Sequence, residues 1–416
     1  MSQKIQWINA LSVQSSLEKA IDEVVEKLQE RLTGDPDLGI LFISSAFASD
    51  YARLLPLLLD KFPLPFLIGC GGGGIVGMED EEQPAEVESS PALSLTVACL
   101  PDVDLSLFHI LPDDLPDSDS APQEWWDMVG VSPEVKPDFI LLSDPFSGAT
   151  NELIEGLDYA YPAAIKVGGL ASSSTMGVAS GLFYRTPDEP QGCFATQGTI
   201  GLAMSGNIVV ESIVAQGCRS IGKIYQVTKG ERNVILELTD NQGNTDSPLN
   251  FLRELINDLD AGDQELAQHS LFIGIARDEF KLELNHGDFL IRNLMGVDPK
   301  YGAIAVGDRI RPGQRIRFHL RDGNASAEDL ETLLDNYFDL KDEVPAVGGL
   351  MFSCMGRGEG LYGEPNFDSE LFLDYFVDIP LSGFFCNGEI GPVGGSTFVH
   401  GYTSVFAIFS QPESNS

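Results

Sequence analysis

Residues 38–44 read Leu38-Gly-Ile-Leu-Phe-Ile-Ser44, a run in which apolar and polar residues do not alternate. Such a run is typical of a strand that is buried on both faces, as in a parallel sheet covered by helices. A helical pattern over residues 50–61 follows, and then a second apolar run at residues 65–69. After the glycine-rich residues 70–74 and an acidic stretch comes a third strand-like run at 92–98. The order of these segments predicts a β-α-β-β unit.

The same unit recurs twice. Residues 138–143 match the first strand, 151–161 supply a helix, and 163–169 match the second strand. In both copies 25 residues separate the end of the first strand from a glycine of the second. A looser third copy has its strands at 347–353 and 379–383. Repetition at a fixed spacing indicates duplicated units. We therefore expect an α/β fold of two domains, built from duplicated β-α-β-β units with mixed sheets.

The chain divides into four expected segments. An amphipathic helix over residues 15–32 belongs to an N-terminal lead-in, and the polar stretch Asp240-Asn-Gln-Gly-Asn-Thr-Asp-Ser-Pro248 marks a domain boundary. The apolar runs 199–204 and 208–215, joined by Ser205-Gly-Asn207, predict a hairpin. The expected segments are the lead-in at 1–37, domains at 38–240 and 248–410, and a disordered tail at 411–416.

The charge of the chain restricts its partners. Acidic residues outnumber basic ones 63 to 25, which gives a formal net charge of −38. Such a surface repels phosphate backbones and anionic lipid headgroups, so we expect neither nucleic acid nor membrane as a partner. The N-terminus lacks a secretory signal pattern, and the most apolar stretch, residues 54–68, is interrupted by Asp60, Lys61 and three prolines. We expect a cytoplasmic protein.

The sequence pattern argues against a metal site and against a nucleotide cofactor. The six cysteines contain no CxxC pair and no histidine cluster accompanies them, so no metal site is predicted. The segment Ile68-Gly-Cys-Gly-Gly-Gly-Gly-Ile-Val-Gly77 lacks the Lys-Ser/Thr end of a phosphate loop. Acidic residues follow it, and they would repel a pyrophosphate. A tight turn at the edge of a cleft explains these glycines better than a nucleotide site, and no cofactor is expected.

Two arginines stand beside cysteines and glycines. Arg219 lies in Val214-Ala-Gln-Gly-Cys-Arg-Ser-Ile-Gly222, and Arg357 lies in Phe352-Ser-Cys-Met-Gly-Arg-Gly358. A guanidinium can bind a ligand carboxylate through two parallel hydrogen bonds. The alternative for Arg219 is an ion pair that ties down neighbouring acidic loops. Near Arg357, the positive charge would favour the thiolate form of a cysteine.

Most of the remaining candidate chemistry lies in one block. Residues 382–404 read Ser382-Gly-Phe-Phe-Cys-Asn-Gly-Glu-Ile-Gly-Pro-Val-Gly-Gly-Ser-Thr-Phe-Val-His-Gly-Tyr-Thr-Ser404. Cys386 and His400 could form a nucleophile pair, although a buried, unreactive cysteine is the commoner case. Glu389 could bind an ammonium group or accept backbone N–H bonds from the glycines around it, and Asn387 could bind an amide. His400 could instead hydrogen-bond its own loop.

These segments together resemble the FIST family, named for F-box and intracellular signal transduction proteins. Ile68-Gly-Cys-Gly71, Val167-Gly-Gly169 and the Arg219 segment are similar to the FIST N domain. The Arg357 segment and Gly383-Phe-Phe-Cys-Asn-Gly-Glu-Ile-Gly-Pro392 are similar to the FIST C domain. The resemblance assigns residues 38–240 and 248–410 to these two domains. About 37 residues precede the first predicted strand, too few for the F-box or kinase that some family members carry.

The resemblance implies a sensory protein that binds a small ligand, an amino acid or similar metabolite, and passes a signal to a separate downstream protein. We expect no enzyme activity, because the family offers no catalytic residues to carry over. The expected ligand-binding residues are Arg219, Arg357, Cys386, Asn387, Glu389 and His400. Two alternatives stay open: a protein–protein interaction scaffold that uses the acidic surface, and a thiol-dependent enzyme that uses Cys386.

Overall fold

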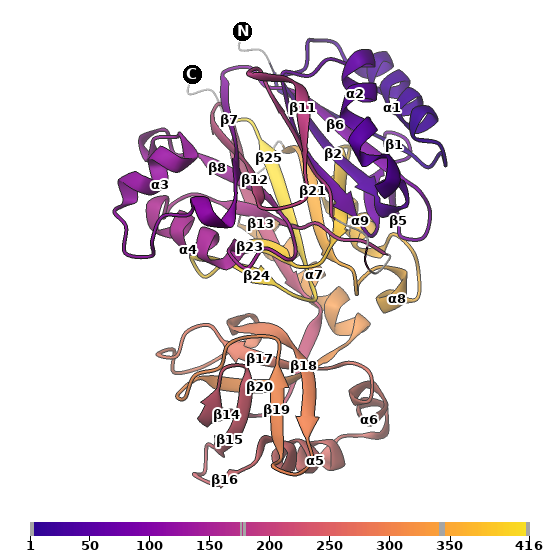
Figure 1. Ribbon diagram of the computed structural model, residues 1–416. Coiled ribbons are helices and arrows are strands. Elements are labelled where there is room, and N and C mark those ends of the chain that lie inside the picture. The colour runs from indigo at the N-terminus through magenta and orange to yellow at the C-terminus, as the bar shows by residue number, and fades with distance from the viewer. Residues whose placement is uncertain (1–3, 175–176, 178–179, 341–345, 413–416) are drawn as a thin grey trace. The chain divides into compact units, whose positions relative to one another are not determined.

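The computed structural model describes residues 4–174, 177, 180–340 and 346–412. It divides into two compact units (Figure 1). The first unit contains residues 1–214, 331–399 and 403–416, and the second contains 215–330 and 400–402. The predicted boundary at 240–248 therefore falls within the second unit. Residues 413–416 of the predicted disordered tail lie outside the described part of the chain.

The first unit consists of three repeats of one strand and helix order. The first repeat runs β1 (Gln6–Ser12), α1 (Leu17–Arg31), β2 (Leu38–Ser44), α2 (Tyr51–Lys61), β3 (Phe66–Gly72), β4 (Ile75–Met78), β5 (Pro84–Val87) and β6 (Leu93–Cys99). The second runs β7 (Val103–Ile110), α3 (Pro122–Val129), β8 (Asp138–Ser143), α4 (Thr150–Ala160), β9 (Lys166–Leu170), β10 (Leu182–Thr186), β11 (Glu189–Ala195) and β12 (Thr199–Gly206).

The third repeat has the same order with an insertion. It runs β13 (Val209–Gln216), α7 (Gly323–Asp339), β21 (Ala346–Cys354), α8 (Glu359–Tyr362), α9 (Phe367–Tyr375), β22 (Leu381–Cys386), β23 (Glu389–Val393), β24 (Ser396–His400) and β25 (Thr403–Ser410). The segment between β13 and α7 forms most of the second unit. Short 3-10 turns occur at Ser45–Asp50, Pro112–Asp114, Pro133–Val135 and His286–Asp288.

The predicted mixed α/β fold is confirmed, and each repeat is centred on one parallel strand pair. These pairs are β2–β3, β8–β9 and β21–β22, and the strands that flank them are antiparallel. The runs predicted as the first and second strands of each unit are these central strands, and every residue of β2 is buried. The strand β1, which precedes the predicted N-terminal helix, was not expected from the sequence.

The three repeats exchange their hairpins. The sheets have the strand orders β1-β6-β2-β3-β10-β11, β7-β12-β8-β9-β23-β24 and β13-β25-β21-β22-β4-β5. The hairpin β4–β5 of the first repeat thus extends the sheet of the third, β10–β11 extends the first, and β23–β24 extends the second. The hairpin predicted at 199–215 is wrong, because β12 and β13 belong to different sheets. The run 208–215 instead begins the third repeat.

The central runs are apolar on both sides because each sheet is covered on both faces. On the inner faces, one core cluster unites residues of all three sheets, with Phe42 stacked on Phe384 at 5.1 Å and edge-on to Phe352. On the outer face of the first sheet, α1 and α2 contribute buried leucines and valines to a second cluster. None of the helices within the described ranges combines the length and apolar character needed to cross a bilayer.

The second unit is an antiparallel barrel with two helices. Its strands are β14 (Cys218–Glu231), β15 (Val234–Asp240), β16 (Thr245–Asp246), β17 (Leu271–Ala276), β18 (Phe289–Asp298), β19 (Ala303–Val306) and β20 (Arg315–Arg321), and its helices are α5 (Pro248–Asp258) and α6 (Ala261–Ala267). Pairing of β14 with both β20 and β15 closes the sheet. Cys218 and Arg321 are register partners, so the inserted chain enters and leaves on neighbouring strands.

Candidate functional site

The glycine-rich segments meet where the hairpins cross between sheets. We call residues 70–74, 170–174 and 385–389 the strand-end crossing. Within it, the Ser172 hydroxyl accepts a hydrogen bond from the Gly73 amide at 2.8 Å and donates one to the carbonyl of Phe385. The Asn387 amide donates to the carbonyl of Leu170 at 3.1 Å. The three repeats are thus joined at this point by hydrogen bonds that involve their backbones.

Three glycines permit the close packing just before the crossing. Gly69, Gly168 and Gly383 lie inside β3, β9 and β22, each opposite a residue of the parallel neighbour. A Cβ atom on them would lie 2.2, 1.8 and 1.8 Å from the carbonyl oxygens of Leu41, Leu141 and Met351 respectively. These glycines are therefore strand residues at equivalent positions of the three repeats, and the turns expected there occur a few residues later.

Cys386 and Glu389 lie in the crossing and are fully buried. Burial, reinforced by the nearby Glu389 carboxyl, raises the pKa of the Cys386 thiol well above its ordinary value. A thiol in that state is a poor nucleophile, because the thiolate is the reactive form. Asn387, between them, is exposed.

Glu389 is held by Thr403. Its Oε2 accepts hydrogen bonds from the Thr403 amide at 3.2 Å and hydroxyl at 2.7 Å, whereas its Oε1 is buried and finds no partner among the residues that the structure describes. Burial raises the pKa of this carboxyl to about 8, against the lowering effects of Thr403 and Arg357. Its partner is thus a threonine rather than the surrounding glycines.

Arg357 is 1% exposed, and the protein itself supplies its carboxylate. Its Nε and Nη2 donate to the two carboxylate oxygens of Asp368 at 2.7 and 2.8 Å, and Nη2 also donates to the Tyr362 hydroxyl. Nη1 is buried and has no hydrogen-bond partner within the described ranges. This arrangement leaves one guanidinium nitrogen for any further group.

The other two predicted residues belong to the second unit. Arg219 donates to Asp322 at 2.7 Å and also pairs with Asp263. These ion pairs correspond to the alternative expectation for Arg219, in which it ties down neighbouring acidic loops instead of binding a ligand. His400 is buried at the end of β24. Arg357, Cys386, Asn387 and Glu389 thus belong to the first unit, whereas Arg219 and His400 belong to the second.

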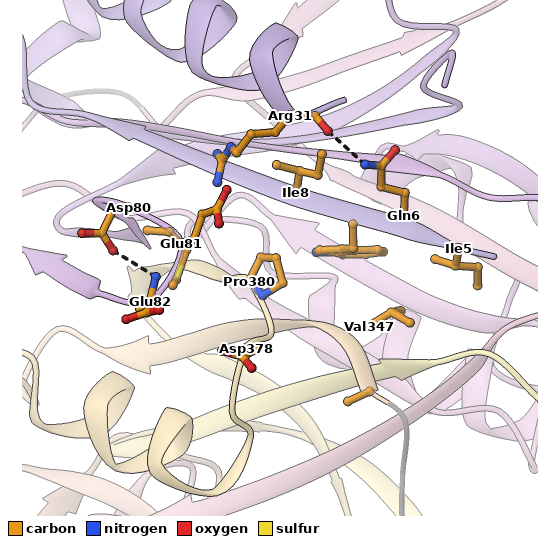
Figure 2. Close-up of a pocket in the computed structure, with 13 residues that line it drawn as sticks. Ile5, Gln6, Ile8, Arg31, Asp80, Glu81, Glu82, Val347, Asp378 and Pro380 are labelled. Atoms are coloured by element: carbon orange, nitrogen blue, oxygen red, sulfur yellow. Dashed lines mark hydrogen bonds between the residues drawn. The ribbon is translucent and has the colours of Figure 1, made fainter. Parts of the chain in front are cut away.

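A pocket of about 520 Å³ lies elsewhere in the first unit, and none of the six predicted residues lines it (Figure 2). We call it the β1 pocket. Its residues come from the start of β1, the end of α1, the β4–β5 hairpin, the start of β21 and the segment before β22: Ile5, Gln6, Trp7, Ile8, Arg31, Met78, Asp80, Glu81, Glu82, Ala346, Val347, Asp378 and Pro380. The hairpin exchange brings these segments of the first and third repeats together.

Trp7, which lines the β1 pocket, carries a buried hydrogen-bond donor. Trp7 is 5% exposed and stacks on Phe409 at 4.6 Å, and its indole N–H has no hydrogen-bond partner among the described residues. A buried polar group normally finds a partner, so an unpaired one needs an explanation. At the pocket, a ligand or an ordered water that accepts from this N–H would supply it.

Charged residues line the β1 pocket together with Trp7. The Arg31 side chain donates from Nε to the carbonyl of Lys27 at 3.2 Å and from Nη2 to the carbonyl of Asn9, so it clips the end of α1 to β1. Asp80 accepts hydrogen bonds from the backbone of the following turn, including the Glu82 amide at 2.9 Å. In Figure 2 the Arg31 guanidinium and the Glu81 carboxylate point toward one another.

The signals for this pocket in the sequence are weak. Its members are spread over five segments, and the strand β1 that forms its wall lies in the predicted lead-in at 1–37. The acidic residues 79–82 look like an ordinary solvated turn. The alternation of Ile5 and Trp7 with Gln6, just before an amphipathic helix, was the one local sign of a strand.

Comparison with known proteins identifies the same two domains along the chain. The sequence model of the FIST N domain matches residues 37–241, and that of the FIST C domain matches residues 248–392. An uncharacterised protein of Mycobacterium tuberculosis is 34% identical over 402 residues, which cover 96% of this chain and 98% of that protein. An F-box/LRR-repeat protein of Arabidopsis thaliana is 33% identical over 119 residues, 25% of this chain and 22% of that protein.

One solved structure aligns along the whole chain with little similarity. It is the crystal structure of a cyanuric acid hydrolase from A. caulinodans, with 9% sequence identity, a TM-score of 0.32, and coverage of 98% of this chain and 99% of that one. A score this low supports no inference about fold or function.

Proposed function

Because this chain belongs to the FIST family, whose domains are sensory domains associated with signal transduction, we propose that it is a non-catalytic sensor that binds a small ligand in the β1 pocket. The observation that carries the proposal is the buried N–H of Trp7, which has no partner among the described residues and belongs to a residue lining a pocket of about 520 Å³. The volume lies in the range of about 300–1,000 Å³ that is typical of ligand pockets, and the lining is more polar than is usual for them.

The chemistry of the pocket suits an amino acid or a similar metabolite. Carboxylates at the rim would receive an ammonium group, while Arg31 and the Trp7 N–H would face a carboxylate or another acceptor. Ile5, Ile8 and Val347 offer an apolar wall for a side chain. In this proposal the strand-end crossing is the structural joint of the three repeats.

Two further observations support the absence of catalysis and the cytoplasmic setting that we propose. Cys386, the candidate nucleophile, is fully buried and has a raised pKa. The six cysteines, all within the described ranges, form no disulfide, which suits a reducing compartment. The signal would then pass to a separate cytoplasmic protein.

A thermal-shift screen of amino acids and related metabolites tests the proposal. Ala346 lies at the start of β21 and lines the pocket, so Ala346→Trp should fill it. Val209→Trp, at the exposed start of β13, is the matched control. We expect a ligand that stabilises the wild type and the control but not the Ala346→Trp protein. No stabilisation by any metabolite at millimolar concentration would refute the proposal, as would equal binding by the filled variant.

The charge distribution favours a scaffold as the second candidate function. The second unit contains 18 acidic and 14 basic residues, so the acidic excess of the chain lies almost wholly in the first unit. Such a surface would dock a basic partner protein, and the docking should weaken as salt rises. Pull-down from lysate at low and high salt tests this, and capture that does not respond to salt would argue against it.

A further inference from the structure

We infer that the β1 pocket selects a protonated amine or guanidine carried on an apolar body, and that it rejects anions of the same shape. The inference rests on the proposed function, because it takes the pocket to be the ligand site. It goes further in naming the charge of the ligand. Four carboxylates, Asp80, Glu81, Glu82 and Asp378, line the pocket against one guanidinium, that of Arg31.

The carboxylates differ in how far the protein itself uses them. Asp80 accepts hydrogen bonds from the backbone amides of Glu82 and Gln83, each at 2.9 Å, and so shapes the turn. The carboxylates of Glu81, Glu82 and Asp378 have no hydrogen-bond or ion-pair partner among the described residues. The turn therefore presents acidic groups to the pocket that the fold does not need.

Arg31 does not cancel this charge. Two of its nitrogens donate to backbone carbonyls, and its guanidinium points toward Glu81 (Figure 2). The positive charge of Arg31 thus offsets that of Glu81 and leaves Asp80, Glu82 and Asp378 in excess. The acidic first unit adds a long-range field that attracts cations and repels anions.

An acidic turn alone would be an ordinary solvated surface in a chain of net charge −38. The independent sign of a ligand is Trp7, which is 95% buried, lines the same pocket and has an N–H without a partner in the described part of the chain. An indole ring also attracts cations held over its face. Together with Ile5, Ile8 and Pro380, it defines a ligand with an apolar body, a cationic group and a hydrogen-bond acceptor.

Three compounds that share a phenylethyl body separate the charge from the shape. We would measure the binding of phenethylamine, phenylalanine and 3-phenylpropionate by isothermal titration calorimetry at low salt and pH 7. The amine and the amino acid should bind, with the amine at least tenfold tighter than the propionate. Equal or tighter binding of the propionate would overturn the inference.

Two double variants locate the charge. Glu82→Gln with Asp378→Asn removes two pocket carboxylates, and asparagine tolerates the φ of 63° at position 378. Glu26→Gln with Glu30→Gln removes two exposed charges of α1 outside the pocket. The pocket variant should weaken phenethylamine about tenfold and the control less than twofold. Equal weakening by both would mean a diffuse field and would overturn the inference.

The failure of this inference can be told apart from failure of the proposed function. A neutral or anionic metabolite that stabilises the protein and is blocked by Ala346→Trp would overturn the cation preference but keep the pocket as a ligand site. No binding by any of the three compounds or by the wider screen would overturn both.

Discussion

Arg357 shows at the residue scale how the first unit accommodates a buried charge. Its guanidinium is paired with Asp368, which is itself fully buried, through two hydrogen bonds. Removing one partner of a buried ion pair leaves an uncompensated charge and typically costs about 3–5 kcal/mol. Asp368→Asn should therefore lower the melting temperature strongly. The control is Glu18→Gln, which breaks the exposed pair with Arg53 and should change it little. Equal shifts in the two variants would contradict the prediction.

Glu389 predicts a specific dependence of stability on pH. Burial raises its pKa to about 8 in the folded protein, against an ordinary value of 4.5 for the exposed group. The folded state thus keeps a proton that the unfolded state loses, so this group favours folding most below about pH 4.5. Its contribution is lost as pH rises toward 8 and is constant above that.

The variant Glu389→Gln removes this titration. Its stability relative to wild type should therefore rise between pH 5 and pH 8, by up to about 1.4 kcal/mol per pH unit. Glu86, whose pKa is raised to about 7 by burial and by Asp368, titrates in the same window in both proteins, so only the difference between them is informative. Urea unfolding at several pH values measures it. A difference that does not vary with pH would show that Glu389 is ionised in the folded state.

At the scale of elements, the central parallel pairs depend on one glycine each. A Cβ at position 168 would lie 1.8 Å from the Leu141 carbonyl oxygen, and the residue has a φ of 150°. The obstacle is backbone in a buried strand pair, so it cannot move aside cheaply. Gly168→Ala should unfold the first unit or lower its melting temperature far more than Gly148→Ala, whose added Cβ meets no atom within 4 Å. Circular dichroism on heating compares the two, and similar curves would refute the assigned role.

Elements that bury a whole run of residues were predictable from the sequence, and elements defined by their partners were not. Leu38–Ser44 and the helix at Leu17–Arg31 follow from local pattern, because burial on both faces or on one helical face leaves a periodic trace. The 199–215 hairpin failed because Ser205-Gly-Asn207 has turn chemistry whether or not its flanking strands pair. Turn residues report the local backbone and carry no information about the sheet that each strand joins.

At the scale of the whole molecule, the candidate site depends on pairings between distant segments. The repeats could be recognised by spacing, since each has its own parallel pair. The exchange of β4–β5 into the sheet of the third repeat left no such trace, yet it places Glu81 and Glu82 near Val347 and Pro380. The sequence therefore pointed to the strand-end crossing, where the polar residues are contiguous, and missed the pocket, where they are not.

The last prediction concerns the inserted segment of the third repeat. The core shared by the three sheets and the helix-facing clusters of the first two contain no residue between 218 and 321. Conversely, the two clusters of the barrel draw on residues of the second unit alone. Because Cys218 and Arg321 are register partners on adjacent antiparallel strands, their Cα atoms lie within about 5.5 Å. A short linker can therefore replace everything between them.

We expect a protein in which a Gly/Ser linker of about four residues replaces 218–321 to keep the fold of the first unit, since β13 would then lead into α7 as β1 leads into α1. Tyr402, which packs on Phe272 at 4.1 Å, would lose its partner, so Tyr402→Asn should accompany the deletion. The shortened protein should unfold in a single cooperative transition and bind any β1-pocket ligand with the affinity of the full chain, because every lining residue is retained. Loss of the cooperative transition would mean that the barrel is an integral part of the third repeat.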